Sequence, residues 1–142
     1  MCVFHRDDNK QLSVGGISLG AIAKQYGSPV YVYSAAGIIE AFTSFQNAVA
    51  PVNGKVYFAM KANSSLGILA LIRKLGGGMD IVSAGELARA IAAGIKPSDV
   101  VFSGVGKTND EIRQALACHI GQINAESPAE VAAISAIAQE MN

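Results

Sequence analysis

Cysteine is scarce in this chain of 142 residues, which contains only Cys2 and Cys118. A secreted domain stabilised by disulfide bonds would carry more cysteines, so we expect a reduced, cytoplasmic protein. Cys118 beside His119 is not a chelating spacing and no second close pair occurs, so no metal site is predicted. Long hydrophobic runs are also lacking. None could cross a bilayer, and no membrane partner is expected.

An excess of either charge is absent as well, because 11 basic and 11 acidic residues cancel and no basic run occurs. Nucleic acids and anionic membrane surfaces both require clustered Lys and Arg, so neither is an expected partner. Hydrophobic residues make up 51% of the chain and charged residues 15%, which is typical of a folded domain with a buried core. We therefore expect a soluble globular protein.

The beginning of the chain divides into four predicted segments. They are an irregular stretch over residues 1–16, a short helix between Ser18 and Gly27, a strand at Val30–Tyr33, and a long helix that Ser34 caps and Pro51 closes. Apolar residues at helical spacing indicate the helices, and β-branched and aromatic residues indicate the strand. We predict that residues 1–28 form an N-terminal extension and that residues 29–142 form a second domain.

The rest of the chain shows a regular alternation of strand and helix patterns. Strands are predicted at Lys55–Met60, Met79–Val82, Val100–Phe102 and Gly121–Asn124. Helices are predicted at Leu66–Leu75, Glu86–Ala93, Asn109–Ala117 and Ala129–Met141. Strand starts separated by 21 to 24 residues leave room for one helix and two loops, which favours a parallel sheet covered by helices.

Two α/β architectures fit this alternation. A doubly wound sheet needs about five or six units, and a (β/α)8 barrel needs eight units over roughly 250 residues. The four or five units found here correspond to about half a barrel. Because the chain stops where another strand is expected, we interpret it as a fragment.

Polar side chains follow the apolar strands of this pattern, at the strand ends where α/β proteins place their active sites. Lys61 directly follows the strand that ends at Met60. An amine desolvated at that position would be a better nucleophile towards a carbonyl carbon. The alternative is a lysine that extends from the strand end into water.

Two carboxylates follow in and after the next strand. Asp80 lies inside an apolar strand, where a carboxylate needs a partner, and Lys61 or a cofactor group could supply one. Alternatively, Asp80 caps the following helix. Glu86 stands near the start of that helix, where its charge either serves a site or stabilises the positive end of the helix dipole.

The loop Ser103–Thr108 resembles a phosphate-binding loop only superficially. Valine occupies position 101, where the nucleotide-binding pattern requires its first glycine. Gly104 and Gly106 are better explained by tight turns of the backbone, while Lys107 stays a candidate for the site face.

The motif Phe58-Ala59-Met60-Lys61-Ala62-Asn63 resembles the first barrel strand of the fold-type III pyridoxal-phosphate enzymes. These include alanine racemase and the ornithine, arginine and diaminopimelate decarboxylases. Further segments are similar to the diaminopimelate decarboxylase branch, namely Tyr26–Tyr33, Gly78–Leu87, Val101–Thr108 with Glu111, and Ile123–Ser127. Together they cover the chain from about residue 12 onward.

This resemblance implies the N-terminal half of a (β/α)8 barrel that binds pyridoxal 5'-phosphate through the amine of Lys61. It also implies that Asp80 and Glu86 lie near the cofactor. The family's phosphate loop, ring-stacking histidine and C-terminal β domain come later in the sequence than residue 142, so we expect the chain alone to be inactive.

For the parent protein, the resemblance implies decarboxylation of meso-2,6-diaminopimelate to L-lysine by a homodimer. Two alternatives stay open. One is a decarboxylase of ornithine, arginine or carboxynorspermidine, and the other is a non-catalytic homologue that binds the cofactor.

Overall fold

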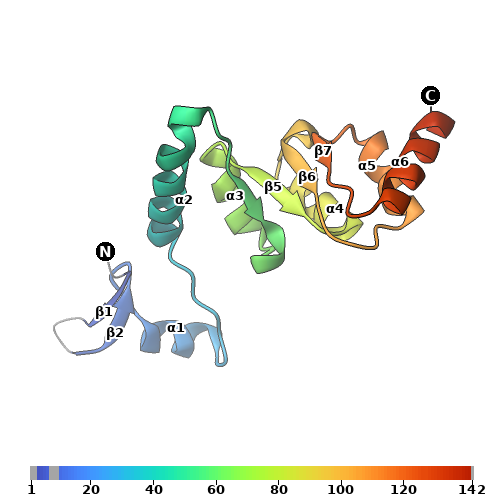
Figure 1. Cartoon of the computed structure of the whole chain (residues 1–142). Helices are drawn as coiled ribbons and strands as arrows, with labels where there is room; N and C mark the ends of the chain where they lie inside the picture. Colours follow the sequence, from blue (N-terminus) through green and yellow to red (C-terminus); the bar gives the residue numbers. More distant parts are fainter. Residues whose placement is uncertain (1–2, 7–9, 142) are drawn as a thin grey trace. The chain divides into compact units, whose positions relative to one another are not determined.

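The computed structural model describes residues 3–6 and 10–141, and the chain forms two compact units (Figure 1). The first unit runs from Met1 to Ser44 and the second from Phe45 to Asn142. The division falls within one long helix, α2 (Ala35–Val49). The predicted boundary between an extension at residues 1–28 and a domain at 29–142 stays a prediction.

The first unit begins with a small antiparallel sheet of three strands, β1 (Phe4–Arg6), β2 (Leu12–Val14) and β3 (Ile17–Ser18). The prediction that residues 1–16 are irregular was therefore wrong at residues 4–6 and 12–14, while residues 1, 2 and 7–9 lie outside the described residues. Gly15 and Gly16 do not end an irregular stretch but form the turn between β2 and β3. Both adopt positive φ angles, +56° and +80°, which glycine reaches without a steric penalty.

Both helices predicted in this region are confirmed. Helix α1 spans Leu19–Tyr26, and the Ser18 hydroxyl accepts a hydrogen bond from the backbone N–H of Ala21 at 3.1 Å. Gly27, with φ +86°, ends this helix. The Ser34 hydroxyl likewise accepts the N–H of Gly37 at 3.2 Å at the start of α2.

The strand predicted at Val30–Tyr33 does not form, and this segment is irregular. The side chain of Tyr31 is 88% exposed. A β-strand requires a neighbouring strand that pairs with its backbone, and no strand among the described residues pairs with this segment. Its β-branched and aromatic residues express a preference for a half-buried surface, which the described residues do not supply.

The second unit contains a four-stranded parallel sheet in the order β4-β5-β6-β7 (Figure 1). The strands are β4 (Tyr57–Ala59), β5 (Gly78–Ile81), β6 (Val100–Phe102) and β7 (Gln122–Ile123). The helices that follow them are α3 (Leu66–Lys74), α4 (Ala84–Ala92), α5 (Asn109–Ala117) and α6 (Pro128–Met141). The described residues also include three short 3-10 turns, η1 (Ala50–Val52), η2 (Met60–Ala62) and η3 (Pro97–Asp99). The predicted series of parallel β/α units is confirmed.

The two faces of this sheet differ in burial and chemistry. One face carries the side chains of Met79, Ile81, Val100 and Phe102, which are fully buried. They form the core together with apolar side chains of the helices, namely Leu69, Ile72, Leu87, Ala90, Ile112, Ala115 and Ile137. The opposite face carries residues that pair across neighbouring strands, Ala59, Asp80, Val101 and Gln122, and none of them is fully buried. Polar groups at the strand ends therefore gather on the more open face.

Candidate functional site

Lys61 lies in the turn η2, immediately after β4, and its side chain is exposed. Ala59 pairs with Asp80 on the neighbouring strand, and Lys61 follows Ala59 by two residues. Within the described part of the chain, the Lys61 amine has no hydrogen-bond or ion-pair partner. Lys61 is exposed among the described residues, so the expected desolvation of its amine is not found in this part of the protein.

Asp80 has a partner, as expected for a carboxylate inside an apolar strand, but the partner is Ser103. The Ser103 hydroxyl donates to Oδ1 of Asp80 at 2.5 Å, and the Asn124 side-chain amide donates to the same hydroxyl at 3.0 Å. Gln122 in turn donates to the Asn124 side-chain oxygen at 2.5 Å. A row of polar side chains thus crosses β5, β6 and β7 on the open face. Sequence reasoning missed this row, because hydrogen-bond partners on neighbouring strands are more than twenty residues apart.

The alternative that Asp80 caps the next helix is wrong, because Ser83 does so. The Ser83 hydroxyl accepts the N–H of Glu86 at 3.2 Å at the start of α4. The Glu86 carboxylate turns back and accepts the N–H of Val82 at 2.7 Å. Glu86 therefore stabilises the strand-to-helix turn after β5, and contact of its carboxylate with a cofactor stays a prediction.

Lys107 does not face the open site, because its side chain is only 2% exposed. Its ammonium donates to the carbonyl oxygens of Gly104 and Asn124, both at 2.7 Å, and lies 3.4 Å from the carboxylate of Glu130. The ammonium also lies 5.6 Å from the ring centre of Phe102. The loops after β6 and β7 are therefore held together by one buried cation. The tight turns expected at Gly104 and Gly106 are confirmed by φ angles of +89° and +74°.

Hydrogen bonds lower the pKa of two carboxylates at this end of the sheet. The backbone N–H of Glu126 donates to Glu130 at 2.7 Å and holds the pKa of Glu130 below its usual 4.5, with a further contribution from nearby Lys107. The backbone N–H groups of Thr108 and Ala84 donate to Glu111 at 3.0 and 3.1 Å and lower its pKa as well. Both carboxylates are thus fixed in the ionised form at neutral pH.

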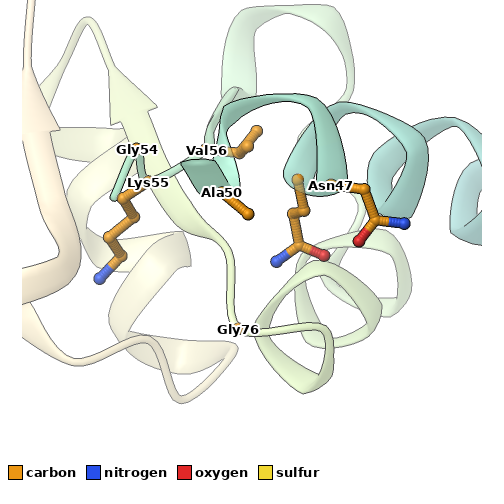
Figure 2. A pocket seen from close by; sticks show the side chains of 7 residues that line it. Asn47, Ala50, Gly54, Lys55, Val56 and Gly76 are labelled. Atoms are coloured by element: carbon orange, nitrogen blue, oxygen red, sulfur yellow. The ribbon is translucent and has the colours of Figure 1, made fainter. Parts of the chain in front are cut away.

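One hollow of the surface lies away from Lys61 and from the polar row. A hollow of about 410 Å³ is lined by Gln46, Asn47, Ala50, Gly54, Lys55, Val56 and Gly76 (Figure 2). Val56 precedes β4 and Gly76 precedes β5, so this hollow lies at the amino ends of the strands, opposite to Lys61. In Figure 2 the Lys55 side chain extends away from Asn47, and its amine pairs with Asp99. The polar groups at the strand ends, and not this hollow, therefore indicate the candidate site.

Within residues 3–6 and 10–141, no group of three or more His, Cys, Asp or Glu side chains is arranged to hold a metal ion. None of the helices described is both long and apolar enough to span a membrane.

Comparison with known proteins gives a consistent result. The family described as "Pyridoxal-dependent decarboxylase, pyridoxal binding domain" matches residues 35–142. Diaminopimelate decarboxylase of Pseudomonas aeruginosa is 45% identical over 131 residues, covering 92% of this chain and 32% of that protein. The enzyme of the same name from Zymomonas mobilis is 48% identical over 136 residues, covering 94% and 32%.

Solved structures agree. The crystal structure of diaminopimelate decarboxylase from Helicobacter pylori complexed with L-lysine superposes with a TM-score of 0.82 at 42% identity. The superposition covers 86% of this chain and 31% of that one. The chain thus spans about a third of the length of the relatives it matches. Its parallel β/α units correspond to the N-terminal part of their barrel, as predicted, and the chain belongs to the family of pyridoxal-dependent decarboxylases, within the pyridoxal-binding domain.

Proposed function

We propose that the protein carrying this chain decarboxylates meso-2,6-diaminopimelate to L-lysine and CO2, with pyridoxal phosphate held by Lys61. The observation that carries this proposal is an exposed lysine at the carboxyl edge of the sheet in a pyridoxal-binding domain, whose amine has no partner among the described residues. A lysine engaged in an ion pair or buried against carbonyl groups, as Lys107 is, could not attach a ligand without losing those bonds.

The residues present fit the cofactor in their chemistry. The cofactor carries an aldehyde, which a free primary amine can bind covalently. Asp80 offers a carboxylate on the same open face, and only its Oδ1 is engaged, by Ser103. Among the described residues its Oδ2 accepts no hydrogen bond, so this oxygen is available to a polar group of a ligand.

When bound, pyridoxal phosphate acts as an electron sink for the charge left on the substrate carbon after CO2 departs. In this chain Lys61 would hold the cofactor and then, as a free amine, accept or donate a proton near the substrate. Asp80 would orient the bound group through Oδ2, with Ser103 fixing the plane of the carboxylate. Glu86 would contribute a negative charge at the edge of the site while it supports the turn after β5.

The proposed substrate rests on the relatives. Those that are 45% and 48% identical are diaminopimelate decarboxylases, and the Helicobacter pylori structure contains L-lysine, which is the product expected from that substrate. Because the chain spans only about a third of these proteins, we expect activity from the full-length protein and none from residues 1–142 alone. We also propose that the full-length protein is a homodimer, which light scattering coupled to size-exclusion chromatography can test.

Covalent labelling of the full-length protein tests the role of Lys61. After reduction with borohydride, peptide mapping should find the pyridoxyl group on Lys61, and Lys61→Ala should abolish both the label and CO2 release. Lys55→Ala is the matched control, since Lys55 precedes β4 at the end opposite to Lys61 and pairs with Asp99. A label on any other lysine would contradict the assignment of Lys61.

Substrate competition tests the proposed reaction. CO2 release should be fastest from meso-2,6-diaminopimelate, with ornithine, arginine and carboxynorspermidine as competitors. Faster CO2 release from one of the competitors would indicate that the protein is a decarboxylase of that amino acid instead. Stable label on Lys61 without CO2 release from any of them would indicate a non-catalytic cofactor-binding protein.

A further inference from the structure

Lys107 is the most completely bonded cation of the second unit. A lysine ammonium has three N–H donors, and here its three contacts are Gly104 O, Asn124 O and the Glu130 carboxylate. The two carbonyl groups belong to different loops, one after β6 and one after β7. Burying a charge is costly unless it is fully bonded, so this arrangement is a closed polar network and not an accidental contact.

Two glutamates close the network from the side of α6. Glu126 Oε1 accepts the N–H of Gly104 at 3.1 Å, which joins the two loops a second time. The N–H of Glu126 in turn donates to Glu130, the carboxylate that faces Lys107. We refer to Gly104, Lys107, Asn124, Glu126 and Glu130 as the loop clamp.

The loop clamp leads to the candidate site through Asn124. The backbone of Asn124 is fixed at both ends, since its N–H donates to Phe102 O at 2.8 Å and its carbonyl accepts from Lys107. Its side chain then donates to the Ser103 hydroxyl at 3.0 Å, and that hydroxyl donates to Asp80 at 2.5 Å. An unbroken series of hydrogen bonds thus runs from Lys107 to the carboxylate proposed to face the cofactor.

We propose that Lys107 is a positioning residue for this site. By fixing the backbone of Asn124, it sets the orientation of the Ser103 hydroxyl and therefore the direction in which Asp80 presents its free oxygen, Oδ2. Lys107 touches neither cofactor nor substrate and acts only through the other residues. The inference rests on the proposed function, because it requires a cofactor beside Asp80.

A double-mutant cycle in the full-length protein tests this pathway, with Lys107→Met and Ser103→Ala as the two changes. Methionine keeps the length and apolar stem of lysine but cannot donate to the two carbonyl groups. The readout is the dissociation constant of pyridoxal phosphate, measured by absorption titration. We expect each single variant to weaken binding by about tenfold, in the usual range of coupling between linked sites.

The double variant distinguishes positioning from general support of the fold. If Lys107 acts through Ser103, the double variant should bind about as weakly as the weaker single variant. Losses that multiply to about a hundredfold would overturn the proposal, as would unchanged affinity in Lys107→Met. The matched control is Arg113→Met. Arg113 lies in α5, the helix that begins just after Lys107 and Thr108, and forms an exposed ion pair with Glu140 outside the loop clamp. This variant should leave the affinity unchanged.

A milder variant covers the case in which Lys107→Met does not fold. Glu130→Gln removes the charge opposite Lys107 but leaves both carbonyl bonds in place, and it should weaken cofactor binding by a few fold in the native background only. If Glu130→Gln weakens cofactor binding by the same factor in the Ser103→Ala background as in the native protein, or does not weaken it in either, the pathway is contradicted. Failure of the native protein to carry the cofactor on Lys61 would instead contradict the proposed function, so the two failures are distinguishable.

Discussion

At the scale of single residues, the glycines at the amino ends of the strands mark where the backbone has least room. A Cβ placed on Gly78 would lie 2.6 Å from the carbonyl oxygen of Asp99 and against the ring of Tyr57. A Cβ on Gly121 would lie 3.2 Å from the carbonyl oxygen of Val100. Neighbouring chain segments can therefore approach this closely only because glycine has a single hydrogen atom in place of a side chain.

Substitution of Gly78 tests this close approach. Gly78→Ala should lower the free energy of unfolding by about 1–3 kcal/mol, because rigid backbone must move to admit the methyl group. Gly67→Ala is the matched control: Gly67 lies in α3, and its added Cβ would meet only the Ser65 hydroxyl at 4.0 Å. That change should be neutral or stabilising by up to about 1 kcal/mol. Urea denaturation of both variants gives the comparison, and equal stability would refute the steric argument.

At the scale of elements, the starts of the helices explain why the β/α units were predictable. Thr108 and Glu111 form a reciprocal capping box at the start of α5, and Ser83 caps α4. The Glu111 carboxylate also accepts the N–H of Ala84 from the first turn of α4, so one side chain serves two helices. The caps are local and visible in the sequence, whereas this second bond depends on how α4 and α5 pack.

The contribution of a cap can be measured by comparing two helices. Thr108→Ala should cost about 1 kcal/mol of unfolding free energy, since the Glu111 N–H loses its acceptor at 3.3 Å. Ser65 occupies the same position before α3 but accepts no hydrogen bond from that helix. Ser65→Ala should therefore cost clearly less in the same thermal or urea denaturation experiment. A cost equal to that of Thr108→Ala would show that the hydrogen bond is not the cause.

At the scale of the whole molecule, the second unit is asymmetric. Helices bury one face of its sheet, while the other face carries Asp80 and the polar row that ends at Gln122. The buried face supplies the hydrophobic stabilisation, and the open face supplies the groups that can meet a ligand. The ionised carboxylates Glu111 and Glu130 tie the loops of this open end to the helices.

The lowered pKa values of Glu111 and Glu130 predict how the stability of the fold depends on pH. Their pKa values are lower in the folded protein than the ordinary 4.5, so their stabilising effect is complete above about pH 4.5 and is lost as the pH falls through the folded-state pKa. Denaturation measured from pH 7 down to pH 3 should show this loss, and the double variant with Glu111→Gln and Glu130→Gln should show a shallower decline. Glu140→Gln, at a 58% exposed position, should keep the native profile. An unchanged slope in the double variant would contradict the assignment.

Much of the second unit could be predicted because the sequence signals that specify its helices and strands lie within a few residues of each other. The strand at Val100–Phe102 and the helix at Asn109–Ala117 have the predicted bounds, and each rests on apolar spacing and a nearby cap. The first 33 residues were harder to predict. Residues 4–6 form a strand and residues 30–33 do not, and this difference depends on whether another segment pairs with each of them. Periodicity cannot identify such a partner.

The sequence by itself determined the β/α order, the helix caps, the motif around Lys61 and the family to which that motif points. Only the tertiary structure decided that Lys107 is buried, that Ser103 is the partner of Asp80, and that the Lys61 side chain extends into solvent. The reason is physical. Caps and periodic patterns act within a few residues, whereas the burial of a charge and its hydrogen-bond partners depend on segments brought together by the sheet.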